Sequence, residues 1–267
     1  MATNSTFQLF SSSSGVSGFF DSSTETPLPP PPPPVEVLSS EVSLNVICSV
    51  EPVNLEDGLT LLKGRVSTKE VFGLPNSDLV PGVYEGGLKL WEGSLDLIKA
   101  LQAEVQNGHL SFSGKRVLEL GCGHGLPGIF AFLEGASAVH FQDFNAEVLQ
   151  SLTIPNVNAN LSEKLSPFYI KRCNSGHSPH SGYDIVLMAE TIYSISAQHN
   201  LYSLIKKCLS HPGGAVYMAA KKHYFGVGGG TRQFLSMVEK DGVMAASLVA
   251  EVADGSSNVR EVWKLSI

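Results

Sequence analysis

Apolar residues recur at helical and strand spacings along the second half of the chain. A helix is predicted over residues 90–105, where apolar positions are three or four residues apart: Trp91, Leu95, Ile98, Leu101 and Val105. Asn107-Gly108 follows this stripe, and a glycine just past the last turn is typical of a helix C-terminus.

Short apolar runs then alternate with further helical stretches. The predicted strands are Arg116–Leu120, Ala138–Gln142, Phe168–Lys171, Asp184–Ala189, Ala215–Ala220, Ala246–Val252 and Arg260–Ile267. The predicted helices between them are Pro127–Glu134, Glu147–Asn160, Ala197–Leu209 and Thr231–Lys240. This order predicts an α/β fold, a doubly wound and mostly parallel sheet of seven strands with helices on both faces. The last two strands are joined by Asp254-Gly255-Ser256-Ser257, which has no room for a helix, so the last strand should be antiparallel.

The first part of the chain has a different composition. Residues 1–40 are rich in Ser, Thr and Pro and include the run Pro29–Pro34, so we expect a disordered leader that cannot bury enough apolar surface to fold. The proline run favours a spacer, and docking to an SH3 or WW domain is the alternative. Residues 41–267 should form one domain, with 41–110 as an N-terminal extension and first helix and 111–267 as the core.

Charge is divided unevenly along the chain. Lys and Arg total 18 against 25 Asp and Glu, yet no base precedes Lys63 while seven acids do, so residues 63–267 carry 18 charges of each sign. A neutral body argues against direct nucleic-acid binding, and the acidic leader argues against secretory, nuclear-import or organellar signals. No apolar run reaches about 18 residues, which argues against a membrane span. Four separate cysteines favour reduced thiols in an intracellular protein.

The strongest local motif is a glycine loop. The strand Val117–Leu120 leads directly into Gly121-Cys122-Gly123-His124-Gly125, and Pro127 suits the first turn of a helix. Glycine lets the backbone turn tightly and approach a ligand, while the helix N-terminus attracts negative charge. A dinucleotide fits the spacing of Gly123, Gly125 and Gly128, but counted from the strand end the pattern GxGxG, with Glu119 inside the strand, favours S-adenosylmethionine.

Further candidate ligands follow the later strands. Asp143 lies 22 residues after Gly121, where a carboxylate can accept hydrogen bonds from ribose hydroxyls, and Phe144 can lie against adenine. Asn145 is predicted to cap the next helix. After the third strand, Asn174–His177 stands where adenine contacts arise, and Glu190 and Tyr193 follow the fourth strand.

Read together with the upstream segment, these motifs resemble the histidine protein methyltransferase family, whose members methylate a histidine of a large-subunit ribosomal protein. The resemblance covers about residues 60–267. It is carried by Asp78-Leu79-Val80-Pro81-Gly82-Val83-Tyr84-Glu85-Gly86-Gly87-Leu88-Lys89-Leu90-Trp91-Glu92, Val117–Ile129, Gln142-Asp143, Pro155-Asn156-Val157, Glu190-Thr191-Ile192-Tyr193 and His223-Tyr224-Phe225-Gly226-Val227-Gly228-Gly229-Gly230.

The resemblance implies the methyltransferase version of the fold, S-adenosylmethionine as cofactor with S-adenosylhomocysteine as product, and no metal. It also implies a monomer in cytoplasm and nucleus with a ribosomal protein substrate. The implied cofactor contacts are Leu90, Trp91, Glu92, Gly93, Ser94, Glu119, Gly121, Gly123, Gln142, Asp143, Phe144, Ser175, Gly176 and Ala189. The chain departs from the family in having His177 after Ser175-Gly176 and in having Ala189 where a serine is usual.

The predicted reaction is methyl transfer to a neutral imidazole nitrogen by in-line displacement. Glu190 is the first candidate for the carboxylate that fixes the imidazole tautomer, Glu85 is the second, and Tyr193 is expected to orient the ring. A lysine methyltransferase remains an alternative, because Tyr193 and Tyr224 can form an aromatic channel. A non-catalytic cofactor-binding adaptor is another. The segment Lys221–Gly230 is expected to be a flexible cover over the substrate entrance.

Overall fold

The computed structural model describes residues 33–38, 40–41, 49–161, 182–209, 213–253, 255 and 258–267. Its strands are β1 (Ser49–Asn54), β2 (Thr60–Arg65), β3 (Arg116–Leu120), β4 (Ala138–Gln142), β5 (Ile185–Ala189), β6 (Ala215–Lys221), β7 (Ala245–Val252) and β8 (Arg260–Ser266). Its α-helices are α1 (Thr68–Phe72), α2 (Glu92–Gln106), α3 (Leu126–Leu133), α4 (Ala146–Val148), α5 (Ile154–Leu161), α6 (Ile195–Cys208) and α7 (Thr231–Asp241). No helix in this part of the chain is long and apolar enough to cross a membrane.

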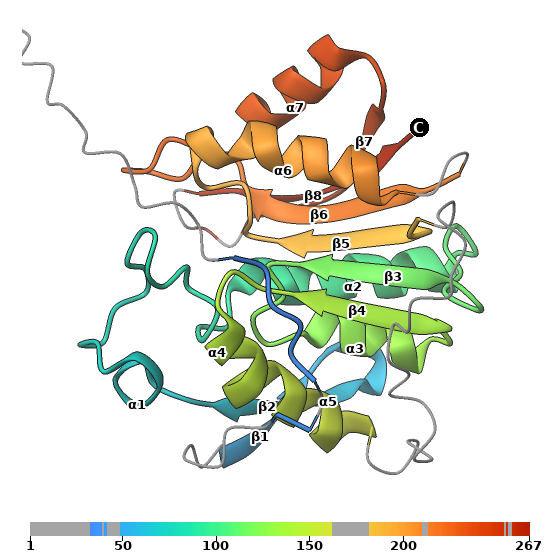
Figure 1. The fold of residues 1–267 in the computed structure, drawn as a ribbon. Helices are drawn as coiled ribbons and strands as arrows, with labels where there is room; N and C mark the ends of the chain where they lie inside the picture. The colour runs from blue at the N-terminus through green and yellow to red at the C-terminus, as the bar shows by residue number, and fades with distance from the viewer. Residues whose placement is uncertain are drawn as a thin grey trace, which may run out of the picture.

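Six of the described strands form one mixed sheet in the order β4-β3-β5-β6-β8-β7 (Figure 1). Strands β4, β3, β5 and β6 pair in parallel, and β8 pairs antiparallel with both β6 and β7. The predicted doubly wound fold with an antiparallel last strand is confirmed. The strand predicted at Phe168–Lys171 and the leader lie outside the described residues.

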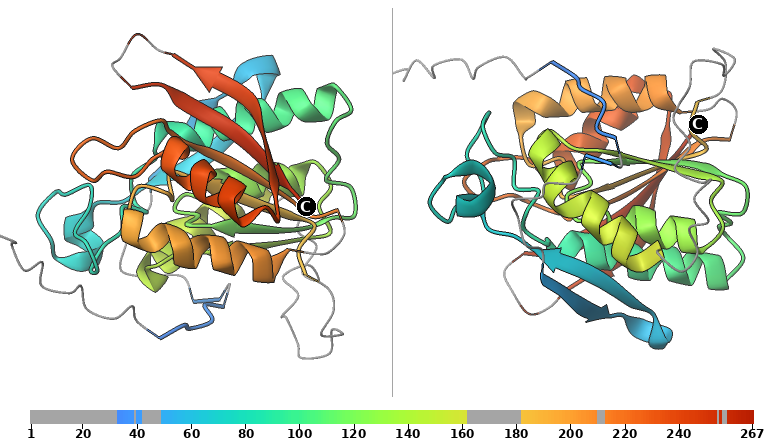
Figure 2. Two further views of the ribbon diagram at one scale, coloured as in Figure 1. Left: turned by 90° about the horizontal axis from the view of Figure 1, so that it is seen from above. Right: turned by 60° about the horizontal axis from the view of Figure 1, so that its bottom comes forward.

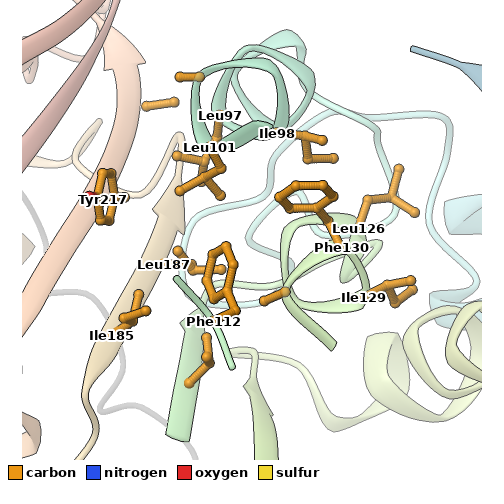
Figure 3. Packing of buried hydrophobic residues seen from close by; sticks show 14 of the residues in the cluster. Leu97, Ile98, Leu101, Phe112, Leu126, Ile129, Phe130, Ile185, Leu187 and Tyr217 are labelled. Carbon is orange, nitrogen blue, oxygen red and sulfur yellow. The ribbon is translucent and has the colours of Figure 1, made fainter. Parts of the chain in front are cut away.

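Helices cover both faces of this sheet (Figures 1 and 2). Successive strand residues point to opposite faces, so Leu187 of β5 packs with α2 and α3, whereas Met188 packs with α6 and α7. In the first cluster Leu97 and Leu101 of α2 face Phe130 of α3 (Figure 3). Both faces are therefore apolar, which explains the nearly continuous apolar strands in the sequence.

The N-terminal strands form a separate two-stranded antiparallel sheet that lies beside α5. Asn156, which is fully buried, accepts from the N–H of Gly64 at 2.6 Å and donates to the carbonyl of His124 at 2.9 Å. Asn160 accepts from the N–H of Leu62 at 2.8 Å and donates to its carbonyl at 2.6 Å. The hairpin is thus tied to the same helix that supports the glycine loop.

The helix predicted over Glu147–Asn160 is interrupted by a π-helical turn at Leu149–Thr153. This turn brings the hydroxyl of Thr153 within 2.6 Å of the carbonyl of Gly123, to which it donates. A π turn places one extra residue in the helix, and such turns are frequent at functional sites. Sequence periodicity alone does not predict it, because the partner carbonyl is 30 residues away.

Candidate active site

The glycine loop lies where the chain crosses from one side of β3 to the other, at the left end of the sheet in Figure 1. Gly121 and Gly123 have φ angles of 59° and 49°. A Cβ atom on Gly121 would lie 2.7 Å from Cγ2 of Thr191, and one on Gly123 would lie 2.8 Å from the carbonyl oxygen of Gly87. Both positions therefore require glycine, and the loop sits at the switch point where doubly wound sheets bind ligands.

Glu119 holds the helix behind this loop. Its side chain is buried, and its Oε2 accepts from the N–H of Gly128 in α3 at 2.7 Å. Burial raises the pKa of Glu119 to about 8. A Cβ on Gly128 would lie 2.5 Å from the ring of Phe141, so this glycine allows α3 to pack closely on the sheet. The structure thus gives Glu119 a protein partner, and its contact with a cofactor stays a prediction.

Asp143 folds back onto the glycine loop from the end of β4. Its Oδ2 accepts from the N–H of Gly123 at 2.9 Å and its Oδ1 from the N–H of Asn145 at 3.1 Å. Burial raises the pKa of the Asp143 carboxyl, while these hydrogen bonds oppose the rise. Gln142 is exposed beside it and accepts from the N–H of Gly121 at 3.4 Å, and Phe144 is half-buried. The structure therefore brings these predicted ligands to one edge.

Asn145 stands at the N-cap position, but its side chain does not cap the helix as predicted. The side-chain amide donates to the carbonyl of Val83 at 2.9 Å and accepts from the N–H of Glu85 at 3.2 Å. A tertiary contact with the upstream loop replaces the local cap, because two backbone groups of that loop need partners.

The start of α2 lies against the same edge. Trp91 occupies the N-cap, and its ring nitrogen donates to the carbonyl of Gly86 at 3.0 Å. Leu90 packs against the apolar core, Glu92 is exposed, and the N–H of Ser94 donates to the carbonyl of Trp91 at 3.1 Å. The helix begins at Glu92, two residues later than the apolar stripe predicts.

Glu190 follows β5 in a left-handed backbone conformation, with a φ of 56°, which is uncommon for a residue other than glycine. The hydroxyl of Tyr224 donates to its Oε2. Its Oε1 is buried without a hydrogen-bond partner among the described residues. A Cβ on Gly93 would lie 2.6 Å from that oxygen. Burial raises the pKa of the Glu190 carboxyl, and the bond from Tyr224 lowers it.

A second carboxylate and tyrosine lie next to the first pair. Oε1 of Glu85 accepts from the N–H of Gly82 at 2.7 Å, and its Oε2 accepts from the hydroxyl of Tyr193. The rings of Tyr193 and Tyr224 meet edge to face, 6.3 Å apart. Burial, together with the neighbouring carboxylates, raises the pKa of both phenols. The three predicted catalytic residues therefore lie in one cluster.

Tyr224 joins this cluster in a way that its sequence pattern does not indicate, since the pattern places it only in an aromatic channel. Its backbone N–H donates to the carbonyl of Gly229 at 2.9 Å, and the N–H of Gly229 donates to the carbonyl of Tyr193 at 3.1 Å. A Cβ on Gly229 would lie 2.2 Å from that carbonyl oxygen, so glycine is required there. The motif His223–Gly230 thereby fixes Tyr224 beside Glu190, and the role of a mobile cover stays a prediction.

Other predicted contacts have mixed placements. Ala189 ends β5 and is half-buried. Ser175 and Gly176 lie outside the described residues, as do Cys48 and Cys173, whereas Cys122 and Cys208 are free thiols. The hydroxyl of Thr191, buried beside Gly121, has no partner within the described part of the chain. No metal-binding group of three or more His, Cys, Asp or Glu side chains occurs there either.

Comparison with known proteins points in the same direction. The model of a family described as lysine methyltransferase matches residues 82–241. A "Histidine protein methyltransferase 1 homolog" from Dictyostelium discoideum is 43% identical over 196 residues, covering 72% of this chain and 62% of the relative. One from Mus musculus is 37% identical over 235 residues, covering 73% of this chain and 64% of the relative. This chain thus spans somewhat less than two thirds of those relatives.

Among solved structures, the Thermus thermophilus 16S rRNA N2 G1207 methyltransferase, in complex with AdoMet and guanosine, is 16% identical. The match has a TM-score of 0.49 and covers 88% of this chain and 52% of that one. The family model spans more than half of the chain, and the resemblance to histidine protein methyltransferases that the motifs indicated is confirmed. The chain belongs to the methyltransferase family that this model describes.

Proposed function

We propose that this protein transfers a methyl group from S-adenosylmethionine to a histidine side chain of a protein, and that its substrate is a large-subunit ribosomal protein. The observation that carries the proposal is the Glu190 carboxylate, held beside the glycine loop with one oxygen lacking a partner among the described residues. The names of the relatives support the choice of histidine.

The edge of the sheet suits the cofactor. Gly121 offers bare backbone with a positive φ, Gln142 offers an exposed amide, and Asp143 offers a carboxylate. The unpartnered hydroxyl of Thr191 and Oε1 of Glu190 are buried polar atoms that a ligand can satisfy. In this proposal Gln142, Asp143 and Phe144 hold the nucleoside, and residues 90–94 with Gly121 hold the methionine end. Bound S-adenosylmethionine would supply an electrophilic methyl group.

The charge of the cluster favours histidine over lysine as the acceptor. At pH 7.4 an imidazole with a pKa of about 6.5 is about 90% neutral, whereas a lysine with a pKa of about 10.4 is neutral in about one molecule in a thousand. Carboxylates at the site favour the charged form of either side chain. A rise of about one pKa unit leaves nearly half of the imidazole neutral but only about one lysine in ten thousand.

The residues of the cluster have separable roles in this reaction. Glu190 accepts the hydrogen bond from the ring nitrogen that is not methylated, which fixes the tautomer and stabilises the cation formed. Glu85 already accepts from Gly82 and Tyr193, so it supports the ring of Tyr193 rather than the imidazole. Tyr193 and Tyr224 bound the space in which the imidazole lies.

Lysine methylation is the second candidate, because the matching family is described by that activity. Incubation of the protein with methyl-labelled S-adenosylmethionine and ribosomal proteins, followed by hydrolysis to amino acids, separates the two. We expect labelled methylhistidine. Methyl-lysine without methylhistidine would contradict the proposal, and cofactor binding without any protein labelling would favour the adaptor.

A further inference from the structure

Tyr224 and Glu190 are 34 positions apart in the sequence but share a hydrogen bond from the tyrosine hydroxyl to Oε2 of the carboxylate. Tyr224 is held by its backbone bond to Gly229, which is itself bonded to the carbonyl of Tyr193. The phenol is thus fixed by the chain on both sides of the cluster. It can act on Glu190 without contacting a substrate.

Glu190 is restrained at three points. Its N–H donates to the carbonyl of Ala219 at 2.9 Å, its Oε2 accepts from Tyr224, and its Oε1 lies against Gly93. The backbone is in the left-handed region, where a glutamate stays only if its surroundings hold it. The side chain is 7% exposed, and Oε1 has no partner among the described residues. A buried carboxylate oxygen without a partner is costly, which indicates that a ligand completes it.

The charged groups facing Glu190 come from several elements. Lys221 at the end of β6 and Arg260 in β8 favour its ionised form, whereas Glu92 at the start of α2 opposes it. Among these neighbours only Tyr224 donates a printed hydrogen bond to the carboxylate. The phenol therefore has the most direct effect on both the orientation and the charge of Glu190.

We propose, on the basis of the proposed function, that Tyr224 is a positioning residue for methyl transfer. By occupying Oε2 of Glu190, it leaves Oε1 as the acceptor for the ring N–H of the histidine substrate. The cofactor's amino group is another N–H donor that can reach a carboxylate, so the test measures cofactor affinity separately from turnover.

The test compares Tyr224→Phe with Tyr202→Phe in the full chain. Tyr202 provides a matched control, because its hydroxyl also donates to a carboxylate, that of Asp241, at 3.0 Å on the opposite side of α6 and α7 from the cluster. Each change removes one oxygen atom and keeps the ring. Nuclear magnetic resonance of carbon-13-labelled glutamate gives the pKa of Glu190, with Glu190→Gln assigning the signal.

We expect Tyr224→Phe to raise the pKa of Glu190 by about one unit and to lower kcat about tenfold or more, with the cofactor Kd unchanged. Tyr202→Phe should change none of these. In a Glu190→Gln background Tyr224→Phe should have no further effect on kcat, because its route of action is gone.

An unchanged pKa of Glu190 in Tyr224→Phe would overturn the proposal, as would an equal loss of kcat in the Glu190→Gln background. A parallel loss of cofactor affinity would assign Oε1 to the cofactor and also overturn it. If the wild-type protein methylates no histidine, the proposed function fails by itself, and the titration of Glu190 still decides whether Tyr224 controls that carboxylate.

Discussion

Oδ2 of Asp143 accepts a hydrogen bond from the backbone N–H of Gly123 at 2.9 Å, across 20 residues of sequence. The bond joins the end of β4 to the glycine loop after β3. One carboxylate therefore shapes the loop and stands where the ribose of a nucleoside cofactor is expected. Changes at this residue should affect cofactor binding before they affect the chemistry.

We predict that Asp143→Ala weakens S-adenosylmethionine binding by about 10- to 100-fold, because a hydrogen bond to a charged group contributes about 1.5–3 kcal/mol. Asp143→Asn keeps one acceptor oxygen and should have a smaller effect. Calorimetric titration measures both. Asp241→Asn, which alters an aspartate paired with Lys206 away from the sheet edge, is the control. An Asp143→Ala protein with wild-type affinity would exclude the ribose assignment.

The two glutamates should differ in their effect on turnover. Glu190 has an unpartnered oxygen, whereas both oxygens of Glu85 accept hydrogen bonds from the protein. Glu190→Gln should therefore lower kcat by about 100-fold, a typical contribution of a positioned acid or base, and leave the cofactor Kd unchanged. Glu85→Gln should have a smaller effect on kcat. The reverse order, measured with a histidine-containing substrate, would identify Glu85 as the main carboxylate.

Gly93 should be required because of Glu190. A Cβ at this position would lie 2.6 Å from Oε1 and 2.9 Å from Cγ of Glu190, so Gly93→Ala should displace the carboxylate and lower kcat about tenfold or more. In a Glu190→Ala background the clash is absent, and the same substitution should cost little. A cost that persists in that background would show that Gly93 contacts the cofactor instead.

Glu119 should make stability depend on pH. Its pKa is about 8 in the folded protein against an ordinary value near 4.5, so the folded state keeps a proton that the unfolded state releases between these values. The free energy of unfolding should therefore fall as the pH rises from 5 to 8, in the range bounded by those two pKa values. Glu119→Gln should remove this part of the dependence. Urea unfolding of both proteins at several pH values isolates it, and equal slopes would contradict the prediction.

Asn156 should contribute more to stability than Asn160. Asn156→Ala leaves the N–H of Gly64 and the carbonyl of His124 without their partner in a fully buried place, at a cost of about 1–3 kcal/mol for each. Asn160 makes two similar bonds to Leu62 but is only partly buried, so water can replace them. Thermal unfolding of the two alanine variants compares the costs, and a larger loss for Asn160→Ala would contradict the argument.

Element positions were largely predictable from the sequence because they depend on local periodicity. Apolar runs of strand length fall on β3, β4, β5 and β6 within one residue of their ends, and the turn after Val252 predicts the final hairpin. The π-helical turn at Leu149–Thr153 was not predictable, because its cause is a hydrogen bond to a distant carbonyl. The side chain of Asn145 left its predicted capping role for the same kind of reason.

The sequence by itself determined the glycine loop, the acid that follows it and the identity of the candidate carboxylates, since these are residue types at fixed spacings. Only the tertiary structure decided how they are paired. It gave both oxygens of Glu85 partners in the protein, left Oε1 of Glu190 without one in the described chain, and placed Tyr224 on Oε2. Those contacts join the ends of β5 and β6 to loops far away in sequence, so packing of the sheet has to bring them together first.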